Sequence, residues 1–271
     1  MSVVERVARE ALACLGEAGR VLVPLACAGC DAPDVVLCGE CSAELGLPVR
    51  LEQHAPALRS EVAVWGAGAY VGRRRRIVLA WKTQGREDLE APLGRWTRGA
   101  GMHVAERLAA LAPPERGGST DSGASTDSGG STDSGSSPDS RASTDSNSQV
   151  IWVVPAPSSW RRRWRGRPPV WHLADGLARG LADAGRASAV VEALHATGAG
   201  HGQRGKGSRE RRRRGQRVTS RLDLTGRAIV LVDDVLTTGA TVQGCIDAVE
   251  HAGGMVIGAV VLAGARVRGR A

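Results

Sequence analysis

The sequence predicts an α/β protein in which helices cover both faces of a parallel β-sheet. Three uninterrupted apolar segments, 150–154, 228–232 and 255–263, have the length and composition of strands buried on both faces. Two segments between them, 173–181 and 242–249, repeat apolar residues every three to four positions, as helices do. With 42% apolar residues among 271, the chain can bury a sizeable core, in one large or two modest domains. This excludes full-length disorder and a small disulfide-stapled protein.

The charge of the chain is positive and unevenly distributed. Lys and Arg outnumber Asp and Glu by 36 to 28, which gives a net charge of +8. Residues 119–148 contribute −4, so the other 241 residues carry +12, and a polyanion is a plausible partner. No uncharged apolar run approaches the ~18 residues of a membrane span. Because Glu5, Glu10 and Glu17 also argue against a secretory leader, we expect a cytoplasmic protein with reduced cysteines and no membrane span.

Residues 1–50 are expected to form a helix followed by a small metal module. An apolar stripe at helical spacing runs through residues 3–15. Two C-x2-C pairs follow, and two such turns can close a tetrahedral site of four thiolates, which suits a structural Zn²⁺. The four expected ligands are Cys27, Cys30, Cys38 and Cys41. An iron–sulfur site, redox thiols and four unrelated free cysteines are the alternatives.

Residues 51–148 combine apolar segments, helical patterns and a polar repeat. From Val62 the apolar segments are broken by glycines, and Tyr70 then leads into a basic helix that starts near Arg73–Arg76 and contains Trp81-Lys82. A second helical pattern covers 101–111. Five near-copies of one polar hexapeptide follow, without aromatic or branched apolar residues, so we expect residues 117–148 to be a disordered insertion. A tolerated loop is the main interpretation, and phosphorylation or glycosylation is the alternative.

The segment 229–241 carries the chemistry. An apolar strand delivers Asp233 and Asp234 at its carboxyl end, and a hydroxyl-rich loop then opens a helix. The backbone N–H groups of residues 237–241 can converge on a phosphate, while the two carboxylates can accept hydrogen bonds from the hydroxyls of a ribose. An acidic strand end with a threonine cap is the structural alternative. Acidic pairs also occur in receiver domains and Mg²⁺ hydrolases, which lack the T-T-G-x-T sequel.

This segment resembles the phosphoribosyl-pyrophosphate (PRPP) signature of type I phosphoribosyltransferases. The resemblance implies that the segment holds ribose 5-phosphate, that Asp233 and Asp234 are catalytic, and that Mg²⁺ bridges pyrophosphate and sugar. It also implies a pyrophosphate loop after the strand 150–154. The implied PRPP-binding residues are Asp233, Asp234, Val235, Leu236, Thr237, Thr238, Gly239, Ala240 and Thr241, with Pro155, Ala156, Pro157 and Ser158 in the pyrophosphate loop.

Features outside this segment are similar to those of ComF-type competence proteins. These are the paired C-x2-C turns, Tyr70 before the helix with Trp81-Lys82, a V-P-A-P run followed by arginines, and Gln203 ahead of a basic loop. The resemblance implies a zinc module in residues 1–50 and a phosphoribosyltransferase-like domain in residues 51–116 and 149–271, interrupted by 117–148. It further implies a role in DNA uptake during natural transformation.

Three basic clusters have a less specific meaning. They are Arg73–Arg76, a second cluster that interleaves tryptophan with arginine, and a third in the loop expected at 201–216. A solvated charged face is one interpretation of each, and a lid over pyrophosphate is another for the third. Stacking and charge together are typical of single-stranded DNA binding, for which the candidates are Trp160, Arg161, Arg162, Arg163, Trp164, Arg165, Arg211, Arg212, Arg213 and Arg214.

Two classes of function follow. The first is an enzyme that displaces pyrophosphate from PRPP with the help of Mg²⁺, including a base or amine phosphoribosyltransferase of nucleotide salvage. The second is a catalytically inactive module that senses PRPP and binds single-stranded DNA for the uptake machinery. No local feature identifies an acceptor.

Overall fold

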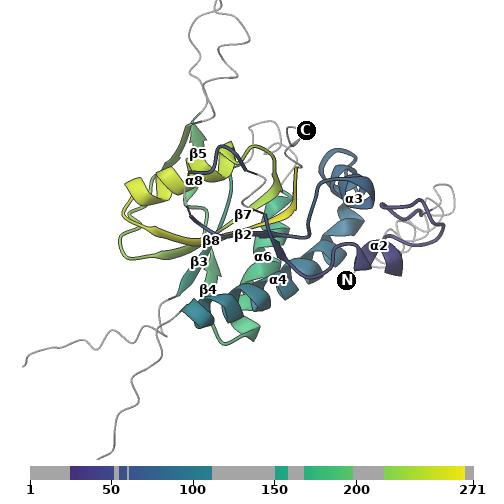
Figure 1. Ribbon diagram of the computed structural model, residues 1–271, viewed down its shortest axis with the longest axis horizontal. Coiled ribbons are helices and arrows are strands. Elements are labelled where there is room, and N and C mark those ends of the chain that lie inside the picture. The colour runs from purple at the N-terminus through teal and green to yellow at the C-terminus, as the bar shows by residue number, and fades with distance from the viewer. Residues whose placement is uncertain are drawn as a thin grey trace, which may run out of the picture.

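The computed structural model describes residues 25–51, 55–59, 61–111, 150–157, 168–197 and 217–265 (Figure 1). The helix expected at 3–15, the insertion at 117–148 and the loop expected at 201–216 lie outside these residues. The helices are α2 (Gly39–Ala43), α3 (Gly72–Thr83), the 3-10 helix η2 (Glu87–Leu89), α4 (Glu90–Leu111), α6 (Val170–Asp183) and α8 (Ala240–His251). The strands are β1 (Val49–Arg50), β2 (Val64–Gly66), β3 (Ile151–Pro155), β4 (Ser188–Val190), β5 (Leu194–Thr197), β6 (Arg217–Ser220), β7 (Ala228–Leu236) and β8 (Met255–Gly264).

Six strands form one sheet in the order β1-β2-β8-β7-β3-β4. All neighbours in it are parallel except β1, which pairs with β2 in the antiparallel sense. The central strands β7 and β8 are the longest and consist largely of buried apolar residues, as expected for strands covered on both faces. The predicted α/β class with a parallel sheet is therefore confirmed.

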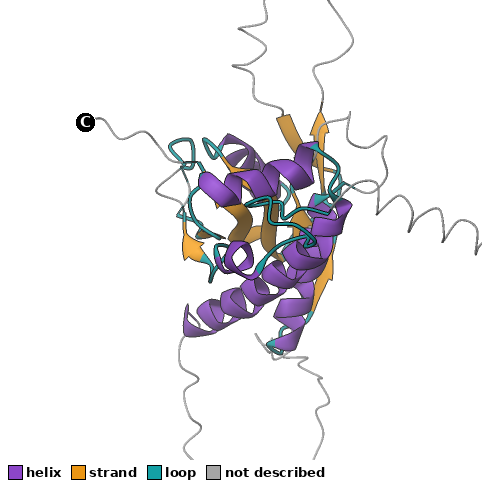
Figure 2. Ribbon diagram, turned by 90° about the vertical axis from the view of Figure 1, so that its right-hand side faces the viewer, coloured by secondary structure: helices purple, strands orange, loops and turns teal. Residues whose placement is uncertain are grey.

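Helices cover the two faces of this sheet through separate apolar clusters. Along β7, Val230 and Val232 pack with α3, α4 and α6, whereas Ile229 and Leu231 pack with α8. This alternation is the two-residue period of a strand. Figures 1 and 2 show the resulting layers, with the sheet between α8 and the pair α4–α6. The predicted apolar stripes of α6 and α8 are the buried faces of these helices.

Helices α4 and α6 pack unusually closely because glycines line their contact. A Cβ at Gly101 would overlap the carbonyl oxygen of Leu177, and one at Gly180 would overlap that of Arg98. A Cβ at Gly176 would overlap Thr97 Oγ1 and the carbonyl oxygen of Gly94. The glycines therefore allow backbone to approach backbone where any side chain would hold the helices apart.

Three elements differ from the sequence-based expectation. Helix α4 begins at Glu90 rather than near residue 101, and it tolerates Pro92 because a first-turn residue needs no N–H donor. Strand β7 continues through Asp233 and Asp234 to Leu236, because β8 pairs with it as far as Gly264. The hairpin of β5 and β6 was not expected, because its strands are short, partly polar and far apart in the sequence. No helix among the described residues is long and apolar enough to cross a membrane.

Candidate active site and cysteine centre

The carboxyl end of β7 leads through a short loop into helix α8. Leu236 is buried and closes the strand, while Thr237, Thr238, Ala240 and Thr241 are exposed. Gly239 caps the helix with φ of 84°, a left-handed conformation that favours glycine. The backbone N–H of Ala240 donates to Thr238 Oγ1 at 3.3 Å. The strand, loop and helix predicted for residues 229–241 thus exist, and the loop lies at a helix N-terminus, where anions bind favourably.

The two aspartates contact different parts of the protein. Asp234 is 9% exposed, and its Oδ2 lies 2.5 Å from Lys82 Nζ at the end of α3. Asp233 Oδ1 accepts the backbone N–H of Asp234 at 2.8 Å. Burial raises the pKa of the Cys245 thiol in α8, and Asp233 raises it further. Since α3 and α8 lie on opposite faces of the sheet, the adjacent carboxylates meet opposite faces, as successive strand residues do. Binding of two hydroxyls of one ribose by this pair stays a prediction.

The predicted pyrophosphate loop begins beside these aspartates. Strand β3 is parallel to β7, with Pro155 opposite Val232. The backbone N–H of Ala156 then donates to the carbonyl oxygen of Val232 at 2.7 Å, one residue before Asp233. Pro157 follows, and Ser158 lies outside the described residues. The sheet therefore brings together the two segments that the sequence assigned to PRPP, although at least 75 positions separate them in the chain.

Two further side chains belong to this edge and were not among the predicted site residues. Tyr70 lies at the end of β8, where its N–H donates to the carbonyl oxygen of Gly264 at 2.6 Å. Burial raises the pKa of Tyr70, Arg75 opposes this shift, and Asp234 adds to it. Lys82 is the partner of Asp234. The signal for both residues was in the sequence, because Tyr70 precedes the basic helix and the Trp81-Lys82 pair lies within it.

Residues 55–59 pack over the loop that precedes α8. The N–H of Ala57 donates to the carbonyl oxygen of Thr238 at 2.8 Å, and the N–H of Arg59 donates to Gln243 Oε1 at 2.6 Å. A Cβ at Gly239 would lie 2.7 Å from the Cβ of Ala55. Gly239 thus meets two requirements, the positive φ and this close approach. No periodicity in the sequence indicated this segment.

The four cysteines form one cluster near the start of the described chain. Their sulfur atoms all lie within 4.8 Å of one another, and the Sγ atoms of Cys30 and Cys38 are 3.6 Å apart. A tetrahedron with ~2.3 Å zinc–sulfur bonds has sulfur–sulfur edges of about 3.8 Å. Burial raises the pKa of Cys27, but backbone N–H groups of Cys38, Gly29 and Cys30 outweigh it and lower this pKa to about 6. The group can therefore hold a metal ion such as zinc.

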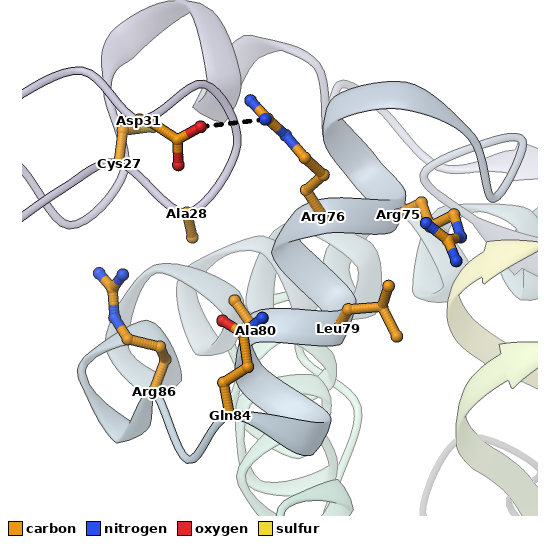
Figure 3. Close-up of a pocket in the computed structure, with 9 residues that line it drawn as sticks. All are labelled: Cys27, Ala28, Asp31, Arg75, Arg76, Leu79, Ala80, Gln84 and Arg86. Carbon is orange, nitrogen blue, oxygen red and sulfur yellow. Dashed lines mark hydrogen bonds and ion pairs between the residues drawn. The ribbon is translucent and has the colours of Figure 1, made fainter.

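The basic cluster Arg73–Arg76 holds the cysteine module against α3. Arg73 pairs with Glu40 at 3.1 Å. Arg74 Nε donates to the carbonyl oxygen of Glu44 at 2.7 Å. Arg76 donates to the carbonyl oxygen of Gly29 and, at 3.0 Å, to Asp31. Three of the four arginines are thus occupied within the protein. Figure 3 shows the cavity of about 290 Å³ between α3 and the module, with Arg76 directed at Asp31.

The other two basic clusters cannot be placed in the fold. Residues 158–167 and 198–216 lie outside the described parts of the chain, so Trp160, Trp164 and the arginines of both clusters have no structural description. Their assignment to DNA stays a prediction.

Fold and site together define a class of protein: an α/β domain in which an acidic strand end and a hydroxyl-rich loop lie at the carboxyl edge of a parallel sheet. Residues 167–270 match the family described as phosphoribosyl transferase domain. This part of the chain is a phosphoribosyltransferase-family domain, and it contains β7, the loop and α8. The matched residues do not include β3 or the cysteine cluster.

One curated protein shows local similarity. Over 45 residues the chain is 49% identical to an orotate phosphoribosyltransferase from Pyrobaculum islandicum. The aligned residues cover 17% of this chain and 23% of that enzyme. The similarity therefore concerns a segment and not the whole of either protein.

Proposed function

We propose that the protein binds PRPP together with Mg²⁺ at the carboxyl edge of its sheet and transfers the phosphoribosyl group to an acceptor. The observation that carries this proposal is the folded segment 229–241, a strand, loop and helix within the family-matched region. In this arrangement, N–H groups of residues 237–241 bind the 5-phosphate, Asp233 and Asp234 bind the ribose hydroxyls, and residues 155–158 bind pyrophosphate. Residues 51–116 and 149–271 would form this domain.

The reaction is a displacement at the anomeric carbon. A nucleophilic atom of the acceptor forms a bond to this carbon while the bond to the pyrophosphate oxygen breaks and its electron pair leaves with pyrophosphate. The acceptor then loses a proton to water. Carboxylate oxygens such as those of Asp233 suit Mg²⁺, which when bound supplies positive charge for the leaving group. Lys82 pairs with the Asp234 carboxylate and holds it in place.

Calorimetric titration of PRPP tests the site. Replacing Asp233 and Asp234 by Asn exchanges charged acceptors for neutral ones, and each charge-assisted bond contributes roughly 1.5–3 kcal/mol. Affinity should therefore fall at least tenfold. Glu250→Gln, at the exposed far end of α8, is the matched control. Unchanged affinity in the double variant would place the PRPP site elsewhere.

Pyrophosphate release from PRPP distinguishes an enzyme from a sensor. The intact protein is assayed alone and with a panel of bases and amines. Release that depends on an acceptor supports a transferase, including one of nucleotide salvage. Binding without release with every acceptor supports the catalytically inactive sensor.

We further propose a structural Zn²⁺ on the four cysteines and, from the resemblance to ComF proteins, a cytoplasmic role in DNA uptake. Because Arg73, Arg74 and Arg76 are engaged with the module, we assign single-stranded DNA binding to residues 160–165 and 211–214. Replacing Trp160 and Trp164 by Ala should weaken DNA binding by about 1–3 kcal/mol per stacked base. Filter binding at ~150 mM salt with no retention of DNA by the intact protein would refute this role.

A further inference from the structure

Helix α3 presents a second set of side chains, different from those that hold the cysteine module. Arg75, Leu79 and Lys82 lie at positions i, i+4 and i+7, which places them along one face of the helix. Arg75 and Leu79 also line the cavity between α3 and the module. In Figure 3, however, their side chains extend towards the strands of the sheet, whereas Arg76 turns towards Asp31. At the end of this face, Lys82 contacts Asp234.

This face meets the sheet at the carboxyl end of β8. The backbone at Ala69 bridges Gly264, and the N–H of Tyr70 donates to the same residue. The effects of Arg75 and Asp234 on the pKa of Tyr70 agree with a single cluster at this edge. The phenol of Tyr70 and the guanidinium of Arg75 therefore lie on one flank of the aspartate pair, and Leu79 lies between Arg75 and Lys82 on the same face of α3.

The order of the strands decides which substrate this flank faces. Strand β7, with the aspartates, lies between β3 and β8. The pyrophosphate loop follows β3, on one side, and the Tyr70 cluster follows β8, on the other. In a displacement, the entering and leaving groups occupy opposite sides of the reacting carbon. If pyrophosphate leaves on the β3 side, the acceptor enters on the side of β8 and α3.

The charge on this flank indicates the chemistry of the acceptor. Lys82 is neutralised by Asp234, so Arg75 supplies the cation. Among the described residues, no acidic side chain forms an ion pair with Arg75, in contrast to Arg73, Arg74 and Arg76. One guanidinium matches one carboxylate through two parallel hydrogen bonds. Leu79, one turn further on, offers an apolar surface for a ring.

We infer that Tyr70, Arg75 and Leu79 form an acceptor subsite that selects a ring compound bearing a carboxylate. This inference rests on the proposed phosphoribosyl transfer, because that reaction defines the two sides of the site. Arg75 is the specificity-determining residue, and its guanidinium binds the carboxylate of the acceptor.

Matched pairs of ligands test the inference on the full-length protein. Nicotinate and nicotinamide form one pair, and orotate and uracil form another, since the members of each differ in the carboxylate. Calorimetry measures their binding to the protein alone, and pyrophosphate release compares them in the presence of PRPP and Mg²⁺. The carboxylate member should bind at least tenfold more tightly in one pair or both, the effect of one charge-assisted contact.

Variants of exposed arginines test whether the preference for the carboxylate depends on Arg75. Arg75→Gln should reduce the ratio of affinities within a pair to near one, and Arg75→Lys, which keeps the charge but loses the fork, should give an intermediate ratio. Arg95→Gln, on the exposed surface of α4, should keep the wild-type ratio. Equal affinities within both pairs, undetectable binding of all four compounds, or a preference that survives Arg75→Gln would overturn the inference.

A separate titration with PRPP keeps the two proposals apart. Normal PRPP affinity without carboxylate preference would refute the acceptor subsite and leave the PRPP site in place. Carboxylate preference that depends on Arg75, in a protein that does not bind PRPP, would refute the proposed transfer while retaining the subsite. Phosphoethanolamine, glycine and ethanolamine then compare a phosphate, a carboxylate and neither group. Tighter binding of phosphoethanolamine than of glycine would also overturn the choice of a carboxylate.

Discussion

The cysteine module and the helix pair α4–α6 are stabilised in opposite ways. Within residues 25–46 only a few residues are buried, and these join the edge of the main apolar cluster. Arginine hydrogen bonds and ion pairs also attach the module to α3. In α4–α6, by contrast, three fully buried leucines of α6 (Leu173, Leu177 and Leu181) pack under a backbone-to-backbone contact. We expect one region to depend on the metal ion proposed for its four sulfur atoms, and the other on many distributed apolar contacts.

Because of this difference, we expect different treatments to unfold the two regions. A module without its own core is expected to fold only while its metal–sulfur bonds are intact. The stability of a packed helix pair depends instead on the volume of its side chains and not on metal. Helix α3 belongs to both, because Ile77 and Trp81 are buried in the main core while its arginines hold the module. The following predictions separate the regions, from the largest expected effect to the smallest.

Metal removal should have the largest effect and should remain confined to the module. Structural zinc contributes ~10 kcal/mol or more in small modules, so chelation or Cys41→Ser should unfold residues 25–46. Hydrogen exchange should show lost protection there and retained protection in β3, β7 and β8. Cys245→Ala, a buried cysteine outside the cluster, is the control and should leave the metal content unchanged. Elemental analysis that finds iron, or a folded module without metal, would contradict zinc.

Overpacking should have the next largest effect and should act only on the helix pair. In Gly180→Ala the added methyl group overlaps the backbone of Arg98, and overpacking of this kind typically costs about 1–3 kcal/mol. Gly99→Ala is the matched control, since a Cβ at this exposed helical position meets nothing within 4 Å. It should stabilise the protein by up to ~1 kcal/mol. Urea denaturation measures both, and equal midpoints for the two variants would refute the close contact.

Loss of one docking arginine should have a smaller effect, limited to the module. Arg76→Ala removes its hydrogen bonds to Gly29 and Asp31, with a net contribution of about 1 kcal/mol. Zinc transfer to a chelator should accelerate about fivefold. Arg75→Ala, at the adjacent position but facing the sheet, should transfer zinc at the wild-type rate. If both variants behave alike, the two faces of α3 do not have separate roles.

The smallest effect should be a pH dependence of the helix pair. Arg98 in α4 hydrogen-bonds both carboxylate oxygens of Asp183 in α6 and holds the pKa of Asp183 below its usual 3.8. The folded state thus favours the charged form, so this stabilisation is present above pH 3.8 and is lost as pH falls through the lowered pKa. The difference in stability between wild type and Asp183→Asn should shrink from pH 7 towards pH 3. A difference that grows in acid would contradict this pairing.

The local parts of the site could be predicted from the sequence. Residues 229–241 carry their own strand, turn and helix signals, and the spacing of the cysteines sets two tight turns, so neighbouring residues decide both structures. The position of the site at the carboxyl edge of the sheet could also be predicted, because the carboxyl ends of parallel strands lie at the same edge. The end of β7 was less predictable, because only pairing with β8 carries it through the aspartates to Leu236.

The sequence by itself determined the class of fold, the acidic strand end with its hydroxyl-rich loop, and the cysteine group, because each follows from patterns within short continuous segments. Tertiary structure alone decided that Lys82 pairs with Asp234, that Arg76 serves the module while Arg75 faces the sheet, and that residues 55–59 cover the loop. These contacts join positions far apart in the chain, 184 residues in the case of Arg59 and Gln243. Their physical basis is the packing of α3, α4 and α8 on the sheet, which no local pattern of residue types specifies.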